Sequence, residues 1–178
     1  MDYKPFPNKK YQIIYADPPW SYNDKNCNGN CQQYYSTMSI KDICNLSVKK
    51  ISDTNCILFL WCTYPMLKEG LQVIESWGFI YKTIAFQWLK FNKKSNSLFF
   101  GLGRWTRGNT EACLIGIKGK ISRQNNNVFQ VIKTRLRAHS KKPDIVRDKI
   151  IQLVGDLPRI ELFARQKVEG WDSWGNEF

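Results

Sequence analysis

Short apolar runs, separated by polar segments, recur along the whole chain and predict its strands. Each run is continuous and rich in β-branched and aromatic residues, which is typical of strands buried on both faces of a sheet. The runs that fit this description are Tyr11–Tyr15, Cys56–Trp61, Thr83–Lys90, Ala112–Lys118, Val128–Ile132 and Ile160–Phe163. We expect these strands to form the centre of the fold.

Three segments between these runs place apolar residues at helical spacing. The first follows Ser39, a residue type that caps helices, with Asp42 in the expected first turn. The second extends from Pro65 to Gly78 and the third from Pro143 to Gly155, so proline stands at each entry and glycine just past each exit. Strand, helix and strand thus follow one another in βαβ order, which predicts an α/β fold with a single, mostly parallel sheet flanked by helices. A chain of 178 residues suits one domain, and we expect it to span residues 1–178.

Two polar segments interrupt this order. Residues 21–38 are rich in Asn, Gly, Ser and Tyr without periodicity, and such a long loop is a candidate lid. Residues 91–110 interleave cations with aromatic rings, namely Lys93, Lys94, Arg104 and Arg107 with Phe99, Phe100 and Trp105. Cations for phosphate and rings for bases are what a single strand of nucleic acid requires, but a solvated basic loop with anchoring aromatics has the same composition.

Charge and cysteine content narrow the class of protein. The chain has 27 Lys and Arg against 15 Asp and Glu, a formal net charge of +12 that favours a polyanionic partner. Its six cysteines form no compact framework, and Cys27 and Cys31 have no second pair or nearby histidine to complete a zinc site. No apolar run reaches the length of a membrane span. We therefore expect a cytoplasmic protein that binds neither a metal nor a membrane.

The end of the first apolar run carries the most specific chemistry. Tyr11–Ala16 leads directly into Asp17-Pro18-Pro19-Trp20, and the two prolines, which lack amide donors, must end the strand. Asp17 is left at the carboxyl edge, where ligands bind in open α/β sheets. The groups held there are a carboxylate, a backbone carbonyl and an indole, and they suit the exocyclic amine of a nucleobase. The two oxygen acceptors can bind the amine hydrogens and return electron density to the nitrogen, while the indole ring stacks on the base. The alternative is a strand that simply ends in a Pro-Pro turn.

The motif Asp17-Pro18-Pro19-Trp20 resembles that of the amino-group methyltransferases, and specifically the adenine N6-methyltransferase family that includes the catalytic subunit of the eukaryotic messenger-RNA adenosine methyltransferase. The resemblance continues in the family's order over nearly the whole chain, through Tyr35-Ser36-Thr37-Met38, Leu58-Phe59-Leu60-Trp61, Trp88-Leu89-Lys90, Arg107-Gly108-Asn109-Thr110-Glu111, Lys141-Lys142-Pro143-Asp144, Glu161-Leu162-Phe163-Ala164-Arg165 and Gly175-Asn176-Glu177. With its chemical motif near the amino terminus, the chain resembles the permuted β group of these enzymes.

This resemblance implies a Rossmann-like, S-adenosylmethionine-dependent methyltransferase domain and assigns roles to residues. The implied catalytic residues are Asp17, Pro18, Pro19 and Trp20, of which Asp17 and the Pro18 carbonyl accept from the amine and Trp20 stacks on the base. The implied cofactor residues are Asp17, Lys142 at the donor carboxylate, Arg165, Gln166 and Lys167 at the ribose, and Asn176 and Glu177 at the adenine. The implied substrate residues are Trp20, Tyr35, Trp61, Lys90, Arg104 and Arg107. This chain departs from the family at Gln166-Lys167, where the messenger-RNA enzyme has His-Asn.

The implied reaction is methylation of the N6 amine of adenine in nucleic acid, with DNA favoured over RNA. Two alternatives stay open. The first is an N4-cytosine methyltransferase, because the cytosine amine poses the same chemical problem. The second is a catalytically inactive, nucleic-acid-binding partner subunit. The expected partners are an adenine-containing nucleic acid and a second protomer, in a homodimer or in a heterodimer with a related subunit.

Overall fold

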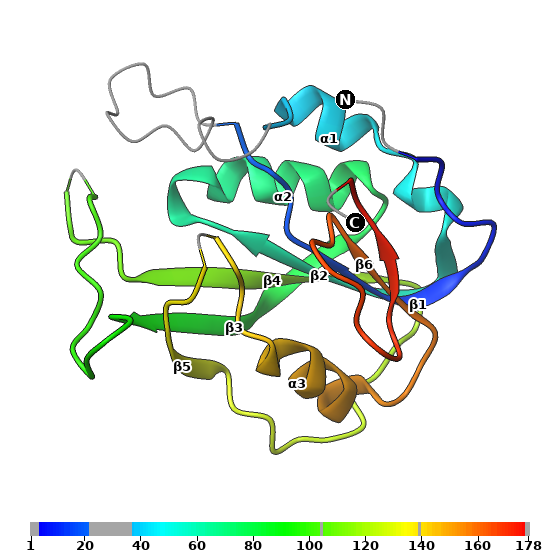
Figure 1. Ribbon diagram of the computed structural model, residues 1–178. Helices are drawn as coiled ribbons and strands as arrows, with labels where there is room; N and C mark the ends of the chain where they lie inside the picture. The colour runs from blue at the N-terminus through cyan, green and yellow to red at the C-terminus, as the bar shows by residue number, and fades with distance from the viewer. Residues whose placement is uncertain (1–3, 22–36, 104, 139, 177–178) are drawn as a thin grey trace.

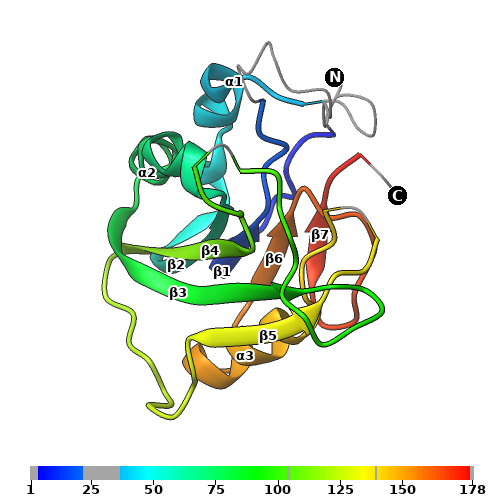
Figure 2. The ribbon, with the colours of Figure 1, turned by 90° about the vertical axis from the view of Figure 1, so that its left-hand side faces the viewer.

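A computed structural model describes residues 4–21, 37–103, 105–138 and 140–176. Within these residues, a seven-stranded sheet lies between two layers of helix (Figure 1, Figure 2). The strands are β1 (Tyr11–Ala16), β2 (Ser52–Cys62), β3 (Ile80–Phe91), β4 (Thr110–Lys118), β5 (Val131–Arg135), β6 (Arg159–Leu162) and β7 (Asp172–Trp174). The helices are α1 (Ile40–Asn45), α2 (Leu67–Ser76) and α3 (Ile145–Val154), with short 3-10 turns η2 (Val48–Lys50) and η3 (Tyr64–Met66).

The strand order is β5-β3-β4-β2-β1-β6-β7, and it confirms a mostly parallel sheet. The pairs β1–β2, β1–β6, β3–β5 and β6–β7 are parallel, whereas β4 is antiparallel to both of its neighbours. A loop without a helix joins β3 to β4, so β4 returns beside β3 in the opposite direction. The strands of the expected βαβ unit, β2 and β3, are parallel but are separated by β4.

The helix boundaries follow the signals in the sequence. Ser39 caps α1, and its side chain accepts a hydrogen bond from the Asp42 amide at 3.1 Å. Pro65 lies in η3, which leads directly into α2. Gly155 ends α3 with a φ of 92°, a conformation that a residue with a Cβ adopts only with strain.

The central strands are buried on both faces, as their continuous apolar runs predict. One face of β2 presents Leu58 and Leu60 to the layer that contains α1 and α2. The other face presents Ile57, Phe59 and Trp61 to the layer that contains α3. Figure 1 shows the two helical layers on opposite sides of the sheet.

Two strand predictions were wrong in detail. The fifth strand begins at Val131 and not at Val128, because pairing with β3 starts at Gln87 and Val131 and leaves Phe129 73% exposed. The run at residues 160–163 is not the last strand, since β7 follows it. With three residues, β7 lacks an apolar run, and its pairing with β6 holds it in the sheet.

The lid expected at residues 21–38 falls mostly on residues 22–36, outside the described part of the chain. None of the described helices is long and apolar enough to cross a membrane.

Candidate active site

The Asp17-Pro18-Pro19-Trp20 motif lies at the carboxyl end of β1, between the two strands parallel to it. The Pro18 carbonyl accepts a hydrogen bond from the Trp20 amide at 2.9 Å, and the Pro19 carbonyl accepts one from Met38 at 2.9 Å. The Trp20 indole donates to the carbonyl of Trp61 at 3.2 Å and is only 5% exposed. The backbone and the indole ring of the motif are therefore held before any ligand binds.

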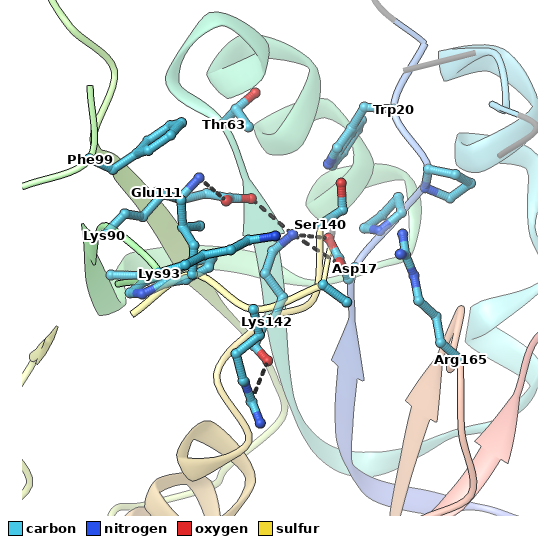
Figure 3. Close-up of a pocket in the computed structure, with 16 residues that line it drawn as sticks. Asp17, Trp20, Thr63, Lys90, Lys93, Phe99, Glu111, Ser140, Lys142 and Arg165 are labelled. Carbon is cyan, nitrogen blue, oxygen red and sulfur yellow. Dashed lines mark hydrogen bonds and ion pairs between the residues drawn. The ribbon is translucent and has the colours of Figure 1, made fainter. Parts of the chain in front are cut away.

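A cavity of about 420 Å³ opens beside this motif and is called the larger cavity below. All four motif residues line it, together with Lys90, Lys93, Phe99, Glu111, Lys142 and Arg165 among others. Trp20 lies across the cavity from Phe99 and Lys93 (Figure 3). The larger cavity thus combines an aromatic wall with charged groups of both signs.

A smaller cavity of about 290 Å³ also has Asp17 in its wall. It is lined by Tyr15, Glu161, Phe163 and Gln166 among others. Five residues line both cavities, namely Asp17, Ala138, Ser140, Lys142 and Arg165. A carboxylate, an ammonium and a guanidinium therefore stand where the two cavities meet.

Four charged side chains alternate in sign along the wall of the larger cavity. The Lys142 ammonium lies 2.9 Å from Asp17 and 3.0 Å from Glu111, and Lys90 lies 2.9 Å from the other oxygen of Glu111. The side chains are 20% exposed for Asp17, 7% for Glu111, 12% for Lys142 and 17% for Lys90. In Figure 3 Lys142 lies between the two carboxylates. Lys142 lies 2.9 Å from each oxygen of Asp17, so with Glu111 its three N–H donors face three carboxylate oxygens.

Burial and pairing shift the pKa values of this chain of charges in different directions. Burial raises the pKa of Asp17 above its ordinary value, and Lys142 opposes that rise only in part. Burial also tends to raise the pKa of Glu111, but Lys142 and Lys90 more than offset it and lower that pKa. Burial tends to lower the pKa of Lys142, and Asp17 and Glu111 reverse the effect, so that pKa is raised. Lys142 is accordingly a permanent cation, and of the two carboxyl groups beside it Asp17 is the one whose pKa is raised.

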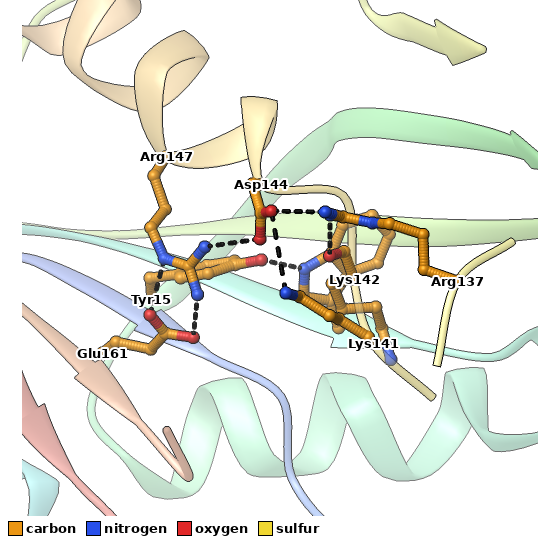
Figure 4. A network of polar contacts seen from close by, with 8 residues as sticks. Tyr15, Arg137, Lys141, Lys142, Asp144, Arg147 and Glu161 are labelled. Atoms are coloured by element: carbon orange, nitrogen blue, oxygen red, sulfur yellow. Dashed lines mark hydrogen bonds and ion pairs between the residues drawn. The ribbon is translucent and has the colours of Figure 1, made fainter. Parts of the chain in front are cut away.

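A second polar network supports the smaller cavity from α3 (Figure 4). Arg147 donates to both oxygens of Glu161, at 2.7 and 2.8 Å, in a bidentate pair. It also donates to Asp144 at 3.3 Å, and Asp144 accepts from Arg137. Arg137 in turn donates to the Lys142 carbonyl at 3.4 Å. The network therefore ties the segment that carries Lys142 to α3 and, through Glu161, to β6.

Backbone strain concentrates at the smaller cavity. Ser140 and Phe163, with φ values of 56° and 60°, are the non-glycine residues of positive φ in the described chain, and both line this cavity. Such conformations cost about 1–3 kcal/mol each and persist where surrounding structure imposes them, commonly at ligand sites. The strained backbone at these two residues therefore indicates a ligand site independently of the Asp17-Pro18-Pro19-Trp20 motif.

The structure brings together many, but not all, of the site residues expected from sequence. Asp17, Pro18, Pro19, Trp20, Lys90, Lys142, Arg165 and Gln166 line one or both cavities. Trp61 does not: it is fully buried behind the larger cavity, where its indole donates to the Tyr15 hydroxyl at 2.7 Å. In this structure Trp61 supports Trp20 through its carbonyl, and a contact of Trp61 with substrate stays a prediction.

The remaining expected residues lie elsewhere. Arg107 is exposed beside Phe100 and lines neither cavity. Lys167 and Asn176 are exposed and also lie outside the cavity walls. Asn176 is nevertheless near Arg165, because the Ala164 amide donates to the Trp174 carbonyl at 3.0 Å and brings the two stretches together. Tyr35, Arg104 and Glu177 are outside the described residues.

Sequence reasoning gave Glu111 no role in the site, and it named Lys93 only as one of several cations in residues 91–110 that could contact nucleic acid. Glu111 is 5% exposed at the start of β4, and an acid that opens an apolar run was the available signal. Lys93 is an exposed lysine on the wall of the larger cavity, and only the path of its loop distinguishes it from Lys94.

Comparison with known proteins identifies the family to which this site belongs. The MT-A70 family profile matches residues 11–177, which is nearly the whole chain. The chain belongs to the MT-A70 family. This membership confirms the resemblance found in the sequence and the Rossmann-like methyltransferase fold.

The relatives differ in how much of their length this domain represents. The chain is 38% identical over 96% of its length to the type II methyltransferase M.MunI of a Mycoplasma species, of which it covers 79%. It is 31% identical to a putative N(6)-adenosine-methyltransferase MT-A70-like protein of Medicago truncatula, and 28% identical to the human N(6)-adenosine-methyltransferase catalytic subunit METTL3. Each of these two matches covers 94% of this chain, but only 26% and 28% of the relative.

Proposed function

We propose that this chain transfers a methyl group from S-adenosylmethionine to the N6 amine of adenine in nucleic acid, with DNA favoured over RNA. The observation that carries the proposal is the position of Asp17, on the wall shared by two cavities, so that a donor and an acceptor meet at one carboxylate. DNA is favoured because the chain is 38% identical to a type II methyltransferase and 28–31% identical to the relatives named for adenosine.

The smaller cavity suits the methyl donor. S-adenosylmethionine supplies an electrophilic methyl group on its sulfonium. The Lys142 ammonium, on the wall of both cavities, can bind the donor's carboxylate in exchange for one of its contacts with Asp17, while Gln166 and Arg165 offer polar groups to the ribose diol. The pairing of Ala164 with Trp174 brings the Asn176 stretch toward Arg165, which supports a role for Asn176 at the donor's adenine end.

The larger cavity suits the acceptor base. Asp17 accepts a hydrogen bond from one N–H of the exocyclic amine and so keeps electron density on the nitrogen. The Pro18 carbonyl already accepts from the Trp20 amide, but its second lone pair can take the other hydrogen. The Trp20 ring, fixed by Trp61, stacks on the base. Lys142, Arg165 and Gln166 would hold the donor beside the base, and this positioning would supply much of the acceleration without a covalent enzyme intermediate. The proton lost from the amine would pass to solvent.

Identification of the methylated nucleoside tests this proposal. The chain is incubated with labelled S-adenosylmethionine and either duplex DNA, single-stranded DNA or RNA, and the product is digested to nucleosides. N6-methyladenine in DNA is the expected product. N4-methylcytosine would establish the first alternative, and absence of transfer to every substrate would support the inactive partner subunit.

Removing a side chain from the proposed donor site should weaken donor binding. Gln166→Ala and Asn176→Ala should each reduce affinity for S-adenosylhomocysteine by about fivefold, since one hydrogen bond contributes roughly 1 kcal/mol. Isothermal titration calorimetry measures the change. Gln72→Ala, at an exposed position on α2, is the control and should bind as the wild type does. Wild-type affinity in both site variants would move the donor site elsewhere.

Lys93 should contact a phosphate of the substrate, whereas its neighbour Lys94 should not. Both are exposed, but only Lys93 lines the larger cavity. Each phosphate contact releases condensed counterions, so Lys93→Ala should make the slope of log affinity against log salt shallower by about 0.7–0.9. Binding of a fluorescent oligonucleotide across a salt series gives this slope. Lys94→Ala is the control, because it removes the same charge from a lysine outside the cavity wall. Equal slopes for the two variants would show that binding depends on net charge and not on a phosphate contact of Lys93.

A further inference from the structure

Tyr15 stands on β1 two residues before Asp17, and its side chain belongs to the wall of the smaller cavity. In the register of the sheet it lies beside Phe59 on β2 and Glu161 on β6. Side chains two residues apart along a strand point to the same face, which agrees with Tyr15 and Asp17 lining one cavity. Tyr15 is only 2% exposed, so its hydroxyl group is buried next to the proposed donor site.

The Tyr15 hydroxyl accepts a hydrogen bond but donates none to the residues that the structure describes. The Trp61 indole donates to it at 2.7 Å. The neighbouring carboxylate on β6, Glu161, is turned to Arg147, which donates to both of its oxygens. A hydroxyl carries one donor as well as its acceptor positions, and a buried donor without an acceptor is destabilising. The O–H of Tyr15 is therefore available to a ligand in the smaller cavity.

The indole of Trp61 places this hydroxyl near Lys142. The Lys142 ammonium lies 5.6 Å from the centre of the Trp61 ring, and the nitrogen of the same indole donates to Tyr15. Lys142 and Tyr15 both line the smaller cavity. In Figure 4 the Tyr15 side chain extends toward the segment that carries Lys142. An ammonium and a phenolic O–H thus stand against one indole, at the same end of the cavity.

The hydroxyl keeps its proton at neutral pH. Burial raises the pKa of Tyr15 well above its ordinary value, and the Cys113 thiol adds to the rise. The Glu161 and Asp17 carboxyl groups also raise this pKa, whereas the hydrogen bond from Trp61 lowers it without reversing the shift. Tyr15 therefore offers a proton, and the group that binds it must be an acceptor.

We propose that the Tyr15 hydroxyl donates a hydrogen bond to the carboxylate of S-adenosylmethionine in the smaller cavity, beside the Lys142 ammonium. This inference rests on the proposed function and deepens it by adding a binding residue to the donor site. The ammonium and sulfonium of the donor offer no acceptor, whereas its carboxylate, ribose and adenine do. The carboxylate is the strongest of these acceptors and the group that Lys142 can bind. Because the Trp61 indole donates to the hydroxyl, it also polarises the O–H and strengthens it as a donor.

Tyr15→Phe tests the inference, because it removes the hydroxyl and keeps the ring. The ligands are S-adenosylhomocysteine and its decarboxylated analogue, which retains the amine, the ribose and the adenine. Isothermal titration calorimetry should show that Tyr15→Phe weakens binding of S-adenosylhomocysteine by about 10- to 100-fold, the usual effect of losing a hydrogen bond to a charged group. Binding of the decarboxylated analogue should change by less than about twofold, since it has no carboxylate to accept the bond.

Tyr11→Phe is the matched control. Tyr11 is a fully buried tyrosine on the same strand and donates its hydroxyl to Asp172 at 2.7 Å, but it lines neither cavity. This variant should bind both ligands as the wild type does. Circular dichroism verifies folding, because Tyr15→Phe also deprives the Trp61 indole of its acceptor. If Tyr15→Phe does not fold, Tyr15→Met lacks the donor as well, adapts to a buried space, and should show the same difference between the ligands.

Two results would overturn the inference. Equal losses of affinity for both ligands would show that the hydroxyl acts only by holding Trp61, and wild-type affinity for both would show that it contacts no part of the donor. Failure of the proposed function is distinguishable, because it appears in the wild type as absence of S-adenosylhomocysteine binding or of methyl transfer. If only the Tyr15 assignment fails, the wild type binds and transfers, and the Tyr15 variants do not distinguish the two ligands.

Discussion

Asp17→Ala and Asp17→Asn should each lower kcat by about 100- to 1,000-fold while the protein stays folded. The carboxylate is the acceptor proposed for the amine hydrogen, and removal of one such preorganised group costs this much in other active sites. The fold should persist because Lys142 keeps its contact with Glu111 at 3.0 Å. The measurement is single-turnover methyl transfer at saturating S-adenosylmethionine, with circular dichroism to verify folding.

The control for this experiment is Asp156→Asn. Asp156 has a side chain that is 80% exposed and pairs with Arg159, and an exposed pair of this kind contributes little to stability. That variant should turn over as the wild type does. Turnover near the wild-type rate in either Asp17 variant would remove Asp17 from the chemistry and the proposed mechanism with it.

The pH dependence of turnover should also reflect the need for an ionised Asp17. Asp17 accepts a hydrogen bond only as a carboxylate, so activity is lost as pH falls through its pKa in the folded protein. Burial raises that pKa above the ordinary value of about 3.9, so the acidic limb of kcat/KM should lie above that of an exposed aspartate.

Lys142→Met should lower the free energy of unfolding by about 3–5 kcal/mol, the usual cost of leaving one member of a buried ion pair without its partner. Glu111 would keep Lys90 at 2.9 Å, so the carboxylate left without a cation is Asp17. The double variant Asp17→Asn with Lys142→Met should therefore recover most of the lost stability. Urea denaturation of the four proteins at one pH gives the coupling free energy.

Two further measurements check the cause of this loss. Lys141→Met alters the neighbouring lysine, which is 32% exposed and 3.8 Å from Asp144, and it should cost less than about 1 kcal/mol. Lys142 is the main group that lowers the pKa of Asp17, so in Lys142→Met that pKa rises further. Protonation of Asp17 as pH falls then restores part of the stability of Lys142→Met relative to the wild type. Equal losses in the Lys141 and Lys142 variants would contradict a buried pair.

The chemical motif and most elements of the fold could be predicted from the sequence because they depend on local physics. Continuous apolar runs mark strands buried on both faces, and prolines and glycines mark where helices begin and end. Pro18 and Pro19 must end β1, which places Asp17 at a strand edge in any α/β arrangement. The order of motifs along the chain was sufficient to indicate the family, which the MT-A70 profile confirms.

The composition of the site was decided by tertiary structure. Glu111 reaches Lys142 only because β4 inserts between β2 and β3, and no local pattern encodes that strand order. Trp61 and Trp88 are both tryptophans on buried strands, yet only Trp88 lines the larger cavity. The three-residue β7 exists because β6 offers it a partner, and its pairing is what brings Asn176 toward Arg165.

What the sequence by itself determined is therefore the set of elements, the edge at which Asp17 stands and the family. Only the tertiary structure decided that Asp17, Lys142, Glu111 and Lys90 form one buried chain of charges and that two cavities meet at Asp17. Hydrophobic periodicity and turn chemistry act over a few residues, whereas strand order and register come from packing between segments far apart in the chain. Asp17 and Lys142, for example, are separated by 125 residues.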